Sequence, residues 1–308
     1  MKDFSVVVPV YGCPEALEPL CDRTVSTISK LGKSYEIVLV NDGCPKDSWK
    51  KIIELCEKNE NIVGINLSRN FGQIHSTNAG ITYTDGEYVV LMDCDLQDKP
   101  EGIADLYNKM SEGYDIVFAK RKNRKDSYLT KLFSKLFYKV YNYFNEGYLD
   151  GDIGNFCIAK RKVVDEYNKI KDRNKSFTPT LAWMGFKQTA IEIESDERFE
   201  GKSSYNFSKK IDLAIDMLTS QSVKPLKAVI NLGIMIAGVS FVYIVVQILK
   251  YFILNDIPEG WTSVIASIFL MSGIILICLG GVGIYIGNIF KQTGGMPEYI
   301  VEEIINGR

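Results

Sequence analysis

Strand and helix signals alternate along the N-terminal part of the chain, and this alternation restricts the fold more than any other feature of the sequence. Short β-branched and apolar runs predict strands over 5–10, 36–41, 62–67, 88–93 and 115–119. Longer amphipathic stretches predict helices over 14–31, 46–57, 74–82 and 100–112. The pattern is typical of an α/β fold with a mainly parallel, doubly wound, Rossmann-like sheet.

One predicted strand ends in two aspartates, Asp93 and Asp95, with a single cysteine between them. Because residues i and i+2 of an extended chain point to the same side, both carboxylates can face one point beyond the strand. Ligands bind at this edge of an open α/β sheet, and Mg²⁺ prefers one or two carboxylates together with substrate oxygens. The pair therefore indicates a cation site, although an acidic pair after a strand also serves as a turn or helix cap.

Composition argues against several classes of protein. The net charge of −2 is unlike that of a nucleic-acid-binding protein. No glycine-rich dinucleotide motif follows the first strand, no P-loop lysine motif occurs, and the single histidine rules out zinc sites built from several histidines. The seven cysteines include no Cys-x-x-Cys pair, so we expect neither a zinc ribbon nor a disulfide framework, and a reducing, cytosol-facing environment.

The C-terminal third contains two long apolar segments. No residue is charged from Val229 to Leu249 or from Trp261 to Phe290, and each segment exceeds the roughly 20 residues that span a bilayer. We expect a two-helix transmembrane hairpin in the cell inner (plasma) membrane. Lysines before the first segment and after the second place the catalytic part and both termini in the cytoplasm. A hairpin buried in a soluble core is the alternative.

A basic amphipathic helix is expected over 121–144, where Leu and Phe recur at i, i+3 and i+4 and lysines occupy the remaining positions. Such a helix lies in a membrane interface, unless it packs against the sheet. A weaker version precedes the first apolar segment. The expected parts are a cytoplasmic domain over 1–206, a juxtamembrane helix over 207–227, and a hairpin with its tail over 228–308, with spans at about 229–252 and 261–289.

Several short motifs occur in a specific order. They include Ser-Val-Val-Val-Pro-Val-Tyr at 5–11, Val-Asn-Asp-Gly at 40–43, Ser-Arg-Asn-Phe-Gly at 68–72, Asp-Cys-Asp-Leu-Gln at 93–97 and Arg-Phe-Glu-Gly-Lys-Ser-Ser-Tyr at 198–205. In these motifs the chain resembles family 2 glycosyltransferases with a GT-A fold. More narrowly, it is similar to polyprenyl-phosphate glycosyltransferases of the bactoprenol glucosyltransferase and dolichyl-phosphate mannose synthase type. The resemblance covers nearly the whole chain.

The resemblance implies how the donor, a UDP- or GDP-linked sugar, is held. Its nucleotide pocket would be lined by Pro9, Tyr11, Asp42 and Asp93. Asp93, Asp95 and Gln97 match the family's metal site, which holds Mg²⁺ or Mn²⁺ on the donor diphosphate and neutralises the leaving group. Arg198 matches a loop arginine that closes over the phosphates, where a guanidinium can bind in bidentate fashion. Asp95 and Arg198 would thus serve catalysis directly.

The resemblance also implies an acceptor site and two departures from the family pattern. The acceptor phosphate would be held by Arg121, Arg124, Lys135 and Ser203. Gly12 and Cys13 follow the pocket tyrosine where the family usually has Asn-Glu. Asn155 stands where many relatives have an aspartate proposed as the catalytic base, and Asp152 is a nearby alternative base. An acceptor phosphate whose second pKa is about 6 is mostly ionised at pH 7 and could react without a base.

These observations predict an inverting, metal-dependent hexosyltransferase that moves a sugar to polyprenyl phosphate of the undecaprenyl type at the cytoplasmic membrane face. A glycolipid or glycan acceptor is the closest alternative, and a non-catalytic membrane scaffold that keeps the fold is a more distant one. Membrane lipid is an expected partner and nucleic acid is not. Gly280, Gly283 and Gly287 offer a small-residue surface for homo-oligomer contacts or for packing within the hairpin.

Overall fold

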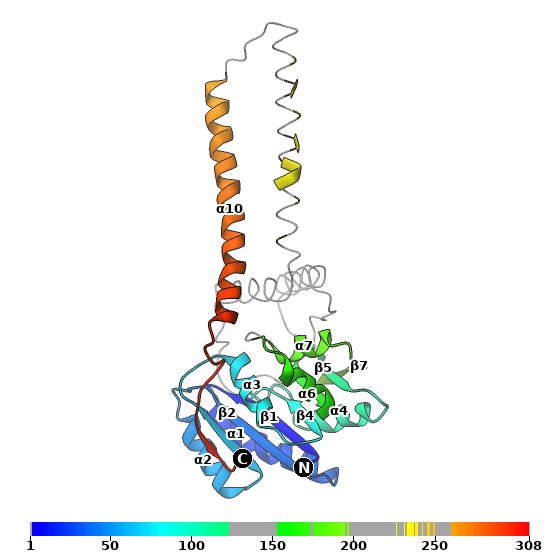
Figure 1. The fold of residues 1–308 in the computed structure, drawn as a ribbon. Helices are drawn as coiled ribbons and strands as arrows, with labels where there is room; N and C mark the ends of the chain where they lie inside the picture. The colour runs from blue at the N-terminus through cyan, green and yellow to red at the C-terminus, as the bar shows by residue number, and fades with distance from the viewer. Residues whose placement is uncertain are drawn as a thin grey trace. The chain divides into compact units, whose positions relative to one another are not determined.

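The computed structural model describes residues 2–122, 153–172, 175–194, 196, single positions between 226 and 249, and 260–307. The chain forms two compact units. The first comprises Met1–Asn142, Glu146–Tyr205 and Met296–Arg308, and the second comprises Tyr143–Asn145 and Asn206–Gly295. The last residues of the chain therefore belong with the N-terminal unit (Figure 1).

A mixed sheet of eight described strands forms the centre of the first unit, in the order β7-β5-β6-β4-β1-β2-β3-β8. The strands are β1 (Phe4–Val10), β2 (Tyr35–Asn41), β3 (Ile62–Leu67), β4 (Tyr88–Leu91), β5 (Ile116–Lys122), β6 (Ile153–Lys160), β7 (Gln188–Glu194) and β8 (Val301–Ile305). Strand β1 pairs in parallel with β2 and β4. Strand β2 also pairs in parallel with β3, and β5 pairs in parallel with β7. Strand β6 runs antiparallel to both β4 and β5, and β8 runs antiparallel to β3.

Helices cover both faces of this sheet. They are α1 (Pro14–Lys30), α2 (Ser48–Lys58), α3 (Gln73–Thr82), α4 (Gly102–Met110), α6 (Arg161–Lys169) and α7 (Phe177–Trp183). Alternate residues of β1 point to opposite faces: Val6 and Val8 pack with α1, α2 and α4, whereas Val7 packs with α3, α6 and α7. Both faces of the central strand are buried, which explains its continuous apolar sequence.

The predicted elements of the N-terminal part are all present, and two corrections apply to the sheet. Strand β4 ends at Leu91, two residues before the predicted end. The sheet is mixed rather than mainly parallel, because β6 and β8 reverse direction. The sequence does not predict strands β6, β7 and β8. Strands β7 and β8 carry glutamates and are half exposed, so their sequences lack the apolar signal of the central strands. Strand β6 is buried only over its second half, so its apolar run is short.

The C-terminal strand β8 extends the sheet at the edge of β3. Asn306 Nδ2 donates hydrogen bonds to Cys56 O (2.8 Å) and Ile62 O (3.0 Å), and Trp49 Nε1 donates to Glu303 Oε2 (3.3 Å). These contacts attach the chain end to α2 and to the start of β3. Residues 296–308 were grouped with the hairpin and its tail, but the structure places them in the first unit.

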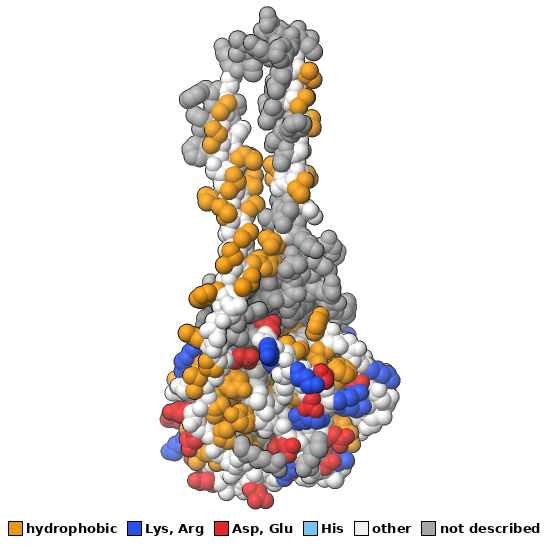
Figure 2. Space-filling model, in the orientation of Figure 1, with side chains coloured by type: hydrophobic (Ala, Val, Ile, Leu, Met, Phe, Trp, Pro, Cys, Tyr) orange, Lys and Arg blue, Asp and Glu red, His pale blue; other side chains and the backbone are white. Residues whose placement is uncertain are grey.

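In the second unit the structure describes helix α10 (Trp261–Thr293), which has 33 residues. Many of its described side chains are apolar and exposed, including Ile275, Leu276 and Phe290 (Figure 2). Across the parts of the chain that the structure describes, no helix has both the length and the apolar character needed to cross a membrane. The predicted transmembrane hairpin is therefore not supported there.

The two predicted amphipathic helices fall almost entirely outside the described residues. Residues 121 and 122, which were predicted to begin the first of them, instead end strand β5. The remainder of 121–144, and 207–227 except for one helical residue at 226, are not described.

Candidate active site

The carboxyl ends of six strands meet at one edge of the sheet. Strands β1 to β4 are parallel to one another, and β5 and β7 run in the same direction as β4 because β6 reverses direction between β4 and β5. Tyr11 follows β1, Asp42 follows β2 and Asp93 follows β4. Arg121, whose backbone pairs with Ile193 of β7, lies at the carboxyl end of β5. Ligands bind at this edge in open α/β sheets.

The segment after β4 keeps the predicted alternation although it is no longer a strand. Asp93, Asp95 and Gln97 are partly exposed, whereas the even-numbered residues from 92 to 98 are buried. Asp95 Oδ1 accepts a hydrogen bond from Gln97 N (3.2 Å), so this carboxylate also shapes the turn. Leu96 has φ +57°, a conformation that non-glycine residues rarely adopt and that recurs at functional sites. The three predicted metal ligands are thus partly exposed, whereas the residues between them are buried.

Two amide side chains orient Asp93. Gln73 Nε2 and Asn155 Nδ2 donate hydrogen bonds to the same carboxylate oxygen, Oδ1, at 2.8 and 3.1 Å. Gln73 is the first residue of α3, and Asn155 lies opposite Asp93 because the β4–β6 register pairs Leu91 with Cys157. Sequence reasoning missed Gln73, although its place at a helix start directly after Gly72 was a usable signal. Asn155 is a donor to Asp93 in the structure, and its predicted catalytic role stays a prediction.

The donor set fits a hard divalent cation. Asp93 and Asp95 supply carboxylates and Gln97 an amide oxygen, and the hydrogen bonds to Asp93 resemble those that fix ligating carboxylates in metal sites. Within the described ranges, no group of three or more His, Cys, Asp or Glu side chains could hold a metal ion. A cation here would depend on Gln97 and on phosphate oxygens of the donor, as is common for Mg²⁺.

Asp42 holds the loop that leads into α3. Its side chain is 3% exposed, and its two oxygens accept hydrogen bonds from Phe71 N (2.7 Å) and Gly72 N (3.0 Å). Burial raises the pKa of Asp42 in spite of these hydrogen bonds. At Gly43, with φ +59°, a Cβ would lie 2.5 Å from Asn70 N, so only glycine allows these two loops to approach. Asp42 therefore has a clear loop-positioning role, and its contact with the nucleotide stays a prediction.

The structure describes only some of the remaining predicted site residues. Tyr11 is 47% exposed and Pro9 is buried within β1. Five residues lie outside the described residues: Arg124, Lys135, Asp152, Arg198 and Ser203. Two positions before Arg198, Asp196 N donates to Gln97 O (3.0 Å), and Lys99 forms an ion pair with Asp196 at 3.2 Å. The backbone that leads to Arg198 is thereby attached to the segment that carries the metal ligands.

A single disulfide joins Cys13 to Cys94, a pair that the scattered cysteine pattern did not predict. The two residues are 81 positions apart in the sequence, so their spacing carried no signal of pairing. The adjacent loop contacts a third cysteine, because Gly12 N donates to Cys44 Sγ at 3.1 Å.

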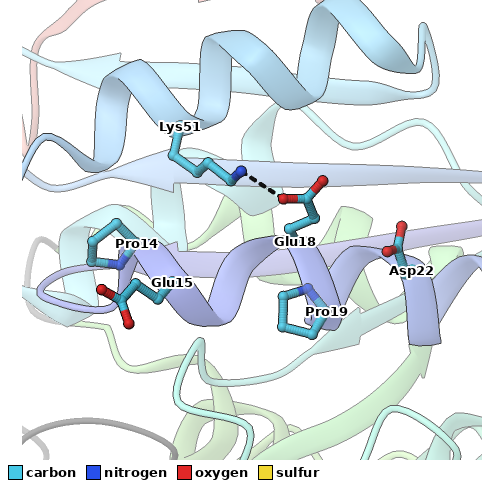
Figure 3. Close-up of a pocket in the computed structure, with 6 residues that line it drawn as sticks. All are labelled: Pro14, Glu15, Glu18, Pro19, Asp22 and Lys51. Atoms are coloured by element: carbon cyan, nitrogen blue, oxygen red, sulfur yellow. Dashed lines mark hydrogen bonds and ion pairs between the residues drawn. The ribbon is translucent and has the colours of Figure 1, made fainter.

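A separate hollow lies between α1 and α2 (Figure 3). It is lined by Pro14, Glu15, Glu18, Pro19, Asp22 and Lys51. Lys51 Nζ lies 2.6 Å from Glu18 Oε2, and Lys58 Nζ lies 2.7 Å from Glu18 Oε1. Hydrogen bonds from the two lysines lower the pKa of Glu18 to about 2. None of the predicted site residues lines this hollow, so it is not the candidate active site.

An α/β fold around a mixed sheet, with an Asp-x-Asp-x-Gln segment at the carboxyl edge of that sheet, is the arrangement of glycosyltransferases of the GT-A type. Residues 5–168 match the family model described as glycosyl transferase family 2. The chain belongs to glycosyl transferase family 2, and it is a glycosyltransferase by this membership and by the names of its relatives.

Two relatives match nearly the full length of the chain. An uncharacterised glycosyltransferase of Synechocystis is 36% identical over 304 residues, which is 98% of this chain and 95% of that one. A prophage bactoprenol glucosyl transferase homolog of Escherichia coli is 34% identical over 305 residues, 98% of this chain and 99% of that one.

A solved structure shows the same fold at low sequence identity. Glucosyl-3-phosphoglycerate synthase of Mycobacterium tuberculosis, crystallised with Mn²⁺, uridine diphosphate and phosphoglyceric acid, aligns with a TM-score of 0.50 and 14% identity. The alignment covers 71% of this chain and 77% of that chain.

Proposed function

We propose that the protein is an inverting glycosyltransferase that transfers a sugar from a nucleoside-diphosphate sugar to polyprenyl phosphate at the cytoplasmic membrane face. The observation that carries the proposal is the arrangement of Asp93, Asp95 and Gln97 as partly exposed residues, alternating with buried ones, in the segment at the carboxyl edge of the sheet. Full-length similarity to a protein named as a bactoprenol glucosyl transferase homolog supports the lipid phosphate as acceptor.

Donor binding follows from the residues at the sheet edge. Asp93, Asp95 and Gln97 would hold Mg²⁺ or Mn²⁺, which neutralises charge on the departing nucleoside diphosphate. The two amides on Asp93 fix its carboxylate before the ligand arrives, so less conformational freedom is lost on binding. Exposed Tyr11 offers an aromatic ring to the nucleotide. The Mn²⁺ and uridine diphosphate in the solved structure of similar fold support this assignment.

Sugar transfer is a single displacement at the anomeric carbon. An oxygen of the acceptor phosphate forms a bond to this carbon while the bond to the diphosphate oxygen breaks, and the configuration inverts. With a second pKa of about 6, the phosphate attacks as a dianion and transfers no proton to the protein. This fits Asn155, which donates to Asp93 and cannot act as a base. Arg121, Arg124, Lys135 and Ser203 are proposed to orient the acceptor phosphate.

Membrane attachment brings this site to a lipid acceptor. It is supported by the two uncharged segments of the sequence and by the exposed apolar side chains of α10. The chain belongs to the first unit both before Asn206 and after Gly295. If the chain crosses a bilayer between these residues, it leaves and re-enters on the same side, which two crossings satisfy and one does not. The termini and the catalytic unit are proposed to be cytoplasmic.

The test is a transfer assay with the full-length protein in nanodiscs, with undecaprenyl phosphate, Mg²⁺ or Mn²⁺, and a panel of labelled UDP- and GDP-sugars. We expect a lipid-linked sugar with one donor, with inverted anomeric configuration by NMR, and no product from Asp95→Ala. Product formed only on an added glycolipid or glycan would overturn the lipid phosphate as acceptor. Intact donor binding without product on any acceptor would support a scaffold instead.

A further inference from the structure

The segment that carries the site aspartates is covalently attached to the loop that follows β1. A disulfide joins Cys94 to Cys13, with their Cα atoms 6.5 Å apart. Cys94 lies between Asp93 and Asp95, and Cys13 directly precedes α1. The cross-link therefore connects the proposed cation site with the loop that begins at Tyr11, a proposed nucleotide contact.

The disulfide lies on the inner side of this segment. Cys13 is 4% exposed and Cys94 is 8% exposed, and both pack in the hydrophobic cluster that includes α1 and α4. Asp93 and Asp95 are partly exposed and alternate with the buried residues. The cation ligands and the cross-link thus occupy opposite sides of one short backbone segment. If reduction of the disulfide makes this backbone more mobile, the carboxylates of Asp93 and Asp95 become more mobile with it.

We propose that Cys13 and Cys94 form a reversible thiol-modification site whose oxidation state sets the affinity of the enzyme for its divalent cation and nucleotide sugar. The inference rests on the proposed function, because it takes Asp93 and Asp95 as cation ligands. In the oxidised form, the cation segment and the nucleotide loop are held together before either ligand arrives. Preorganised groups lose less entropy on binding, so the oxidised form binds the cation more tightly than the reduced form.

The exchange requires only a low-molecular-weight thiol and the corresponding disulfide. In reduction, a thiolate attacks one sulfur of the protein disulfide, forms a mixed disulfide and releases the other sulfur, which takes up a proton. A second small thiol then displaces the first from the protein. The products are two protein thiols and one small-molecule disulfide, so two electrons pass to the protein. Oxidation is the reverse reaction, with the small-molecule disulfide as oxidant.

The Cys13–Cys94 disulfide is not needed to stabilise the fold of the first unit. The first unit buries apolar side chains on both faces of its sheet, so it does not depend on the cross-links that stabilise small secreted domains. With the cytoplasmic placement proposed above, this disulfide belongs to the redox-responsive kind that is typical of cytosolic proteins.

Three other thiols of the described first unit are poorly placed for exchange. Burial raises the pKa of Cys21 and Cys157 to about 12 and that of Cys56 to about 11, which disfavours the thiolate forms of these side chains. Cys44 is a half-buried free thiol. Because Gly12 N, next to Cys13, donates to Cys44 Sγ at 3.1 Å, peptide mapping should follow Cys44 together with the pair.

The experiment measures Mn²⁺ affinity of the full-length protein by electron paramagnetic resonance in two redox states. One sample is oxidised with oxidised glutathione, and the other is reduced with dithiothreitol and desalted under anaerobic conditions. Peptide mapping after alkylation reports the state of Cys13 and Cys94. We expect the Kd for Mn²⁺ to rise about three- to tenfold on reduction, as expected when preorganisation is lost. Cys94→Ser should behave as the reduced protein in both samples, and Cys278→Ser, on α10, should respond as wild type.

Two results would overturn the inference: a Kd for Mn²⁺ that is equal in the two redox states, or cysteines at 13 and 94 that stay alkylatable after oxidation. The comparison of redox states uses the wild-type chain, so it does not depend on the folding of a variant. It also needs no acceptor. Transfer to polyprenyl phosphate with an unchanged Kd would reject only the redox site, and a redox-dependent Kd without transfer would reject only the acceptor.

Discussion

Asp93 owes its orientation to two neutral side chains that come from different elements. Gln73 reaches it from the start of α3 and Asn155 from β6, and both donate to one oxygen. Both donors are neutral, so neither of them offsets the negative charge of the carboxylate, whereas a lysine at either place would neutralise part of it. These two contacts are therefore compatible with the proposed role of Asp93 as a cation ligand.

Replacing Gln73 with alanine should weaken cation binding without disrupting the fold, because Gln73 is exposed and its amide contacts Asp93. Loss of a hydrogen bond to a metal ligand typically costs about 10- to 100-fold in metal affinity, and we expect the lower end here because Asn155 remains. Mn²⁺ titration by electron paramagnetic resonance would measure this change. Gln188→Ala, on β7, is the control for loss of a glutamine, and wild-type affinity in Gln73→Ala would contradict the assignment.

Replacing Asn155 with alanine separates positioning from catalysis. If Asn155 acts through Asp93, the concentration of Mn²⁺ that gives half-maximal transfer should rise about tenfold, while kcat at saturating Mn²⁺ stays close to wild type. Steady-state kinetics over a range of Mn²⁺ concentrations would show the difference. A fall in kcat that excess Mn²⁺ does not restore would instead mean that Asn155 takes part in the chemical step.

Among the elements, α1 and α2 are linked by charge as well as by packing. Glu18 on α1 forms ion pairs with Lys51 and Lys58 on α2, and its pKa falls from 4.5 to about 2. A carboxyl group whose folded pKa is lowered contributes stability that is fully present above its unfolded pKa and is lost as pH falls through the folded value. The contribution of Glu18 should therefore disappear between pH 4.5 and about 2.

The Glu18→Gln variant should have a Tm about 1–3 °C below wild type at neutral pH and low salt, a small effect because the pairs are exposed. The difference should shrink as pH falls from 4.5 and as salt is added. Thermal unfolding followed by intrinsic fluorescence would measure it. Asp22 lines the same hollow, lies in the middle of α1 and makes no ion pair among the described residues, so Asp22→Asn should leave Tm close to that of wild type. A pH-independent difference would rule out the ion pairs as its cause.

The elements also show where sequence reasoning succeeds. The strands β1 to β4 and the helices between them were predictable because buried parallel strands read as continuous apolar runs. The alternation that leaves Asp93, Asp95 and Gln97 partly exposed was predictable from the same periodicity. Strands β7 and β8 were missed because edge strands need fewer apolar residues, and β6 was missed because only its second half is an apolar run. The Cys13–Cys94 pair and the Gln73 contact were missed because they depend on the approach of separate loops, which local sequence does not encode.

For the whole molecule, the division of the chain into units leads to a prediction of topology. Because the first unit contains residues on both sides of Asn206–Gly295, the boundaries at the two ends of this range should lie on the same face of the membrane. In inside-out vesicles, protease should remove tags from both termini. A cysteine introduced by Asn255→Cys, in the link between the apolar segments, should react with an impermeant reagent only from the opposite face. Labelling of this position from the cytoplasmic face would contradict two crossings.

The edge position of β8 has a consequence for the order in which the protein is made. The ribosome completes β1 to β7 and the entire second unit before it reaches Val301. Until then β3 has an open edge, and exposed edges readily pair with other chains. The sheet of the catalytic unit can be completed only after the apolar segments have been synthesised. Its final assembly therefore comes after the step at which those segments would enter the membrane. A nascent chain arrested before residue 301 would carry the whole proposed donor site on an unfinished sheet.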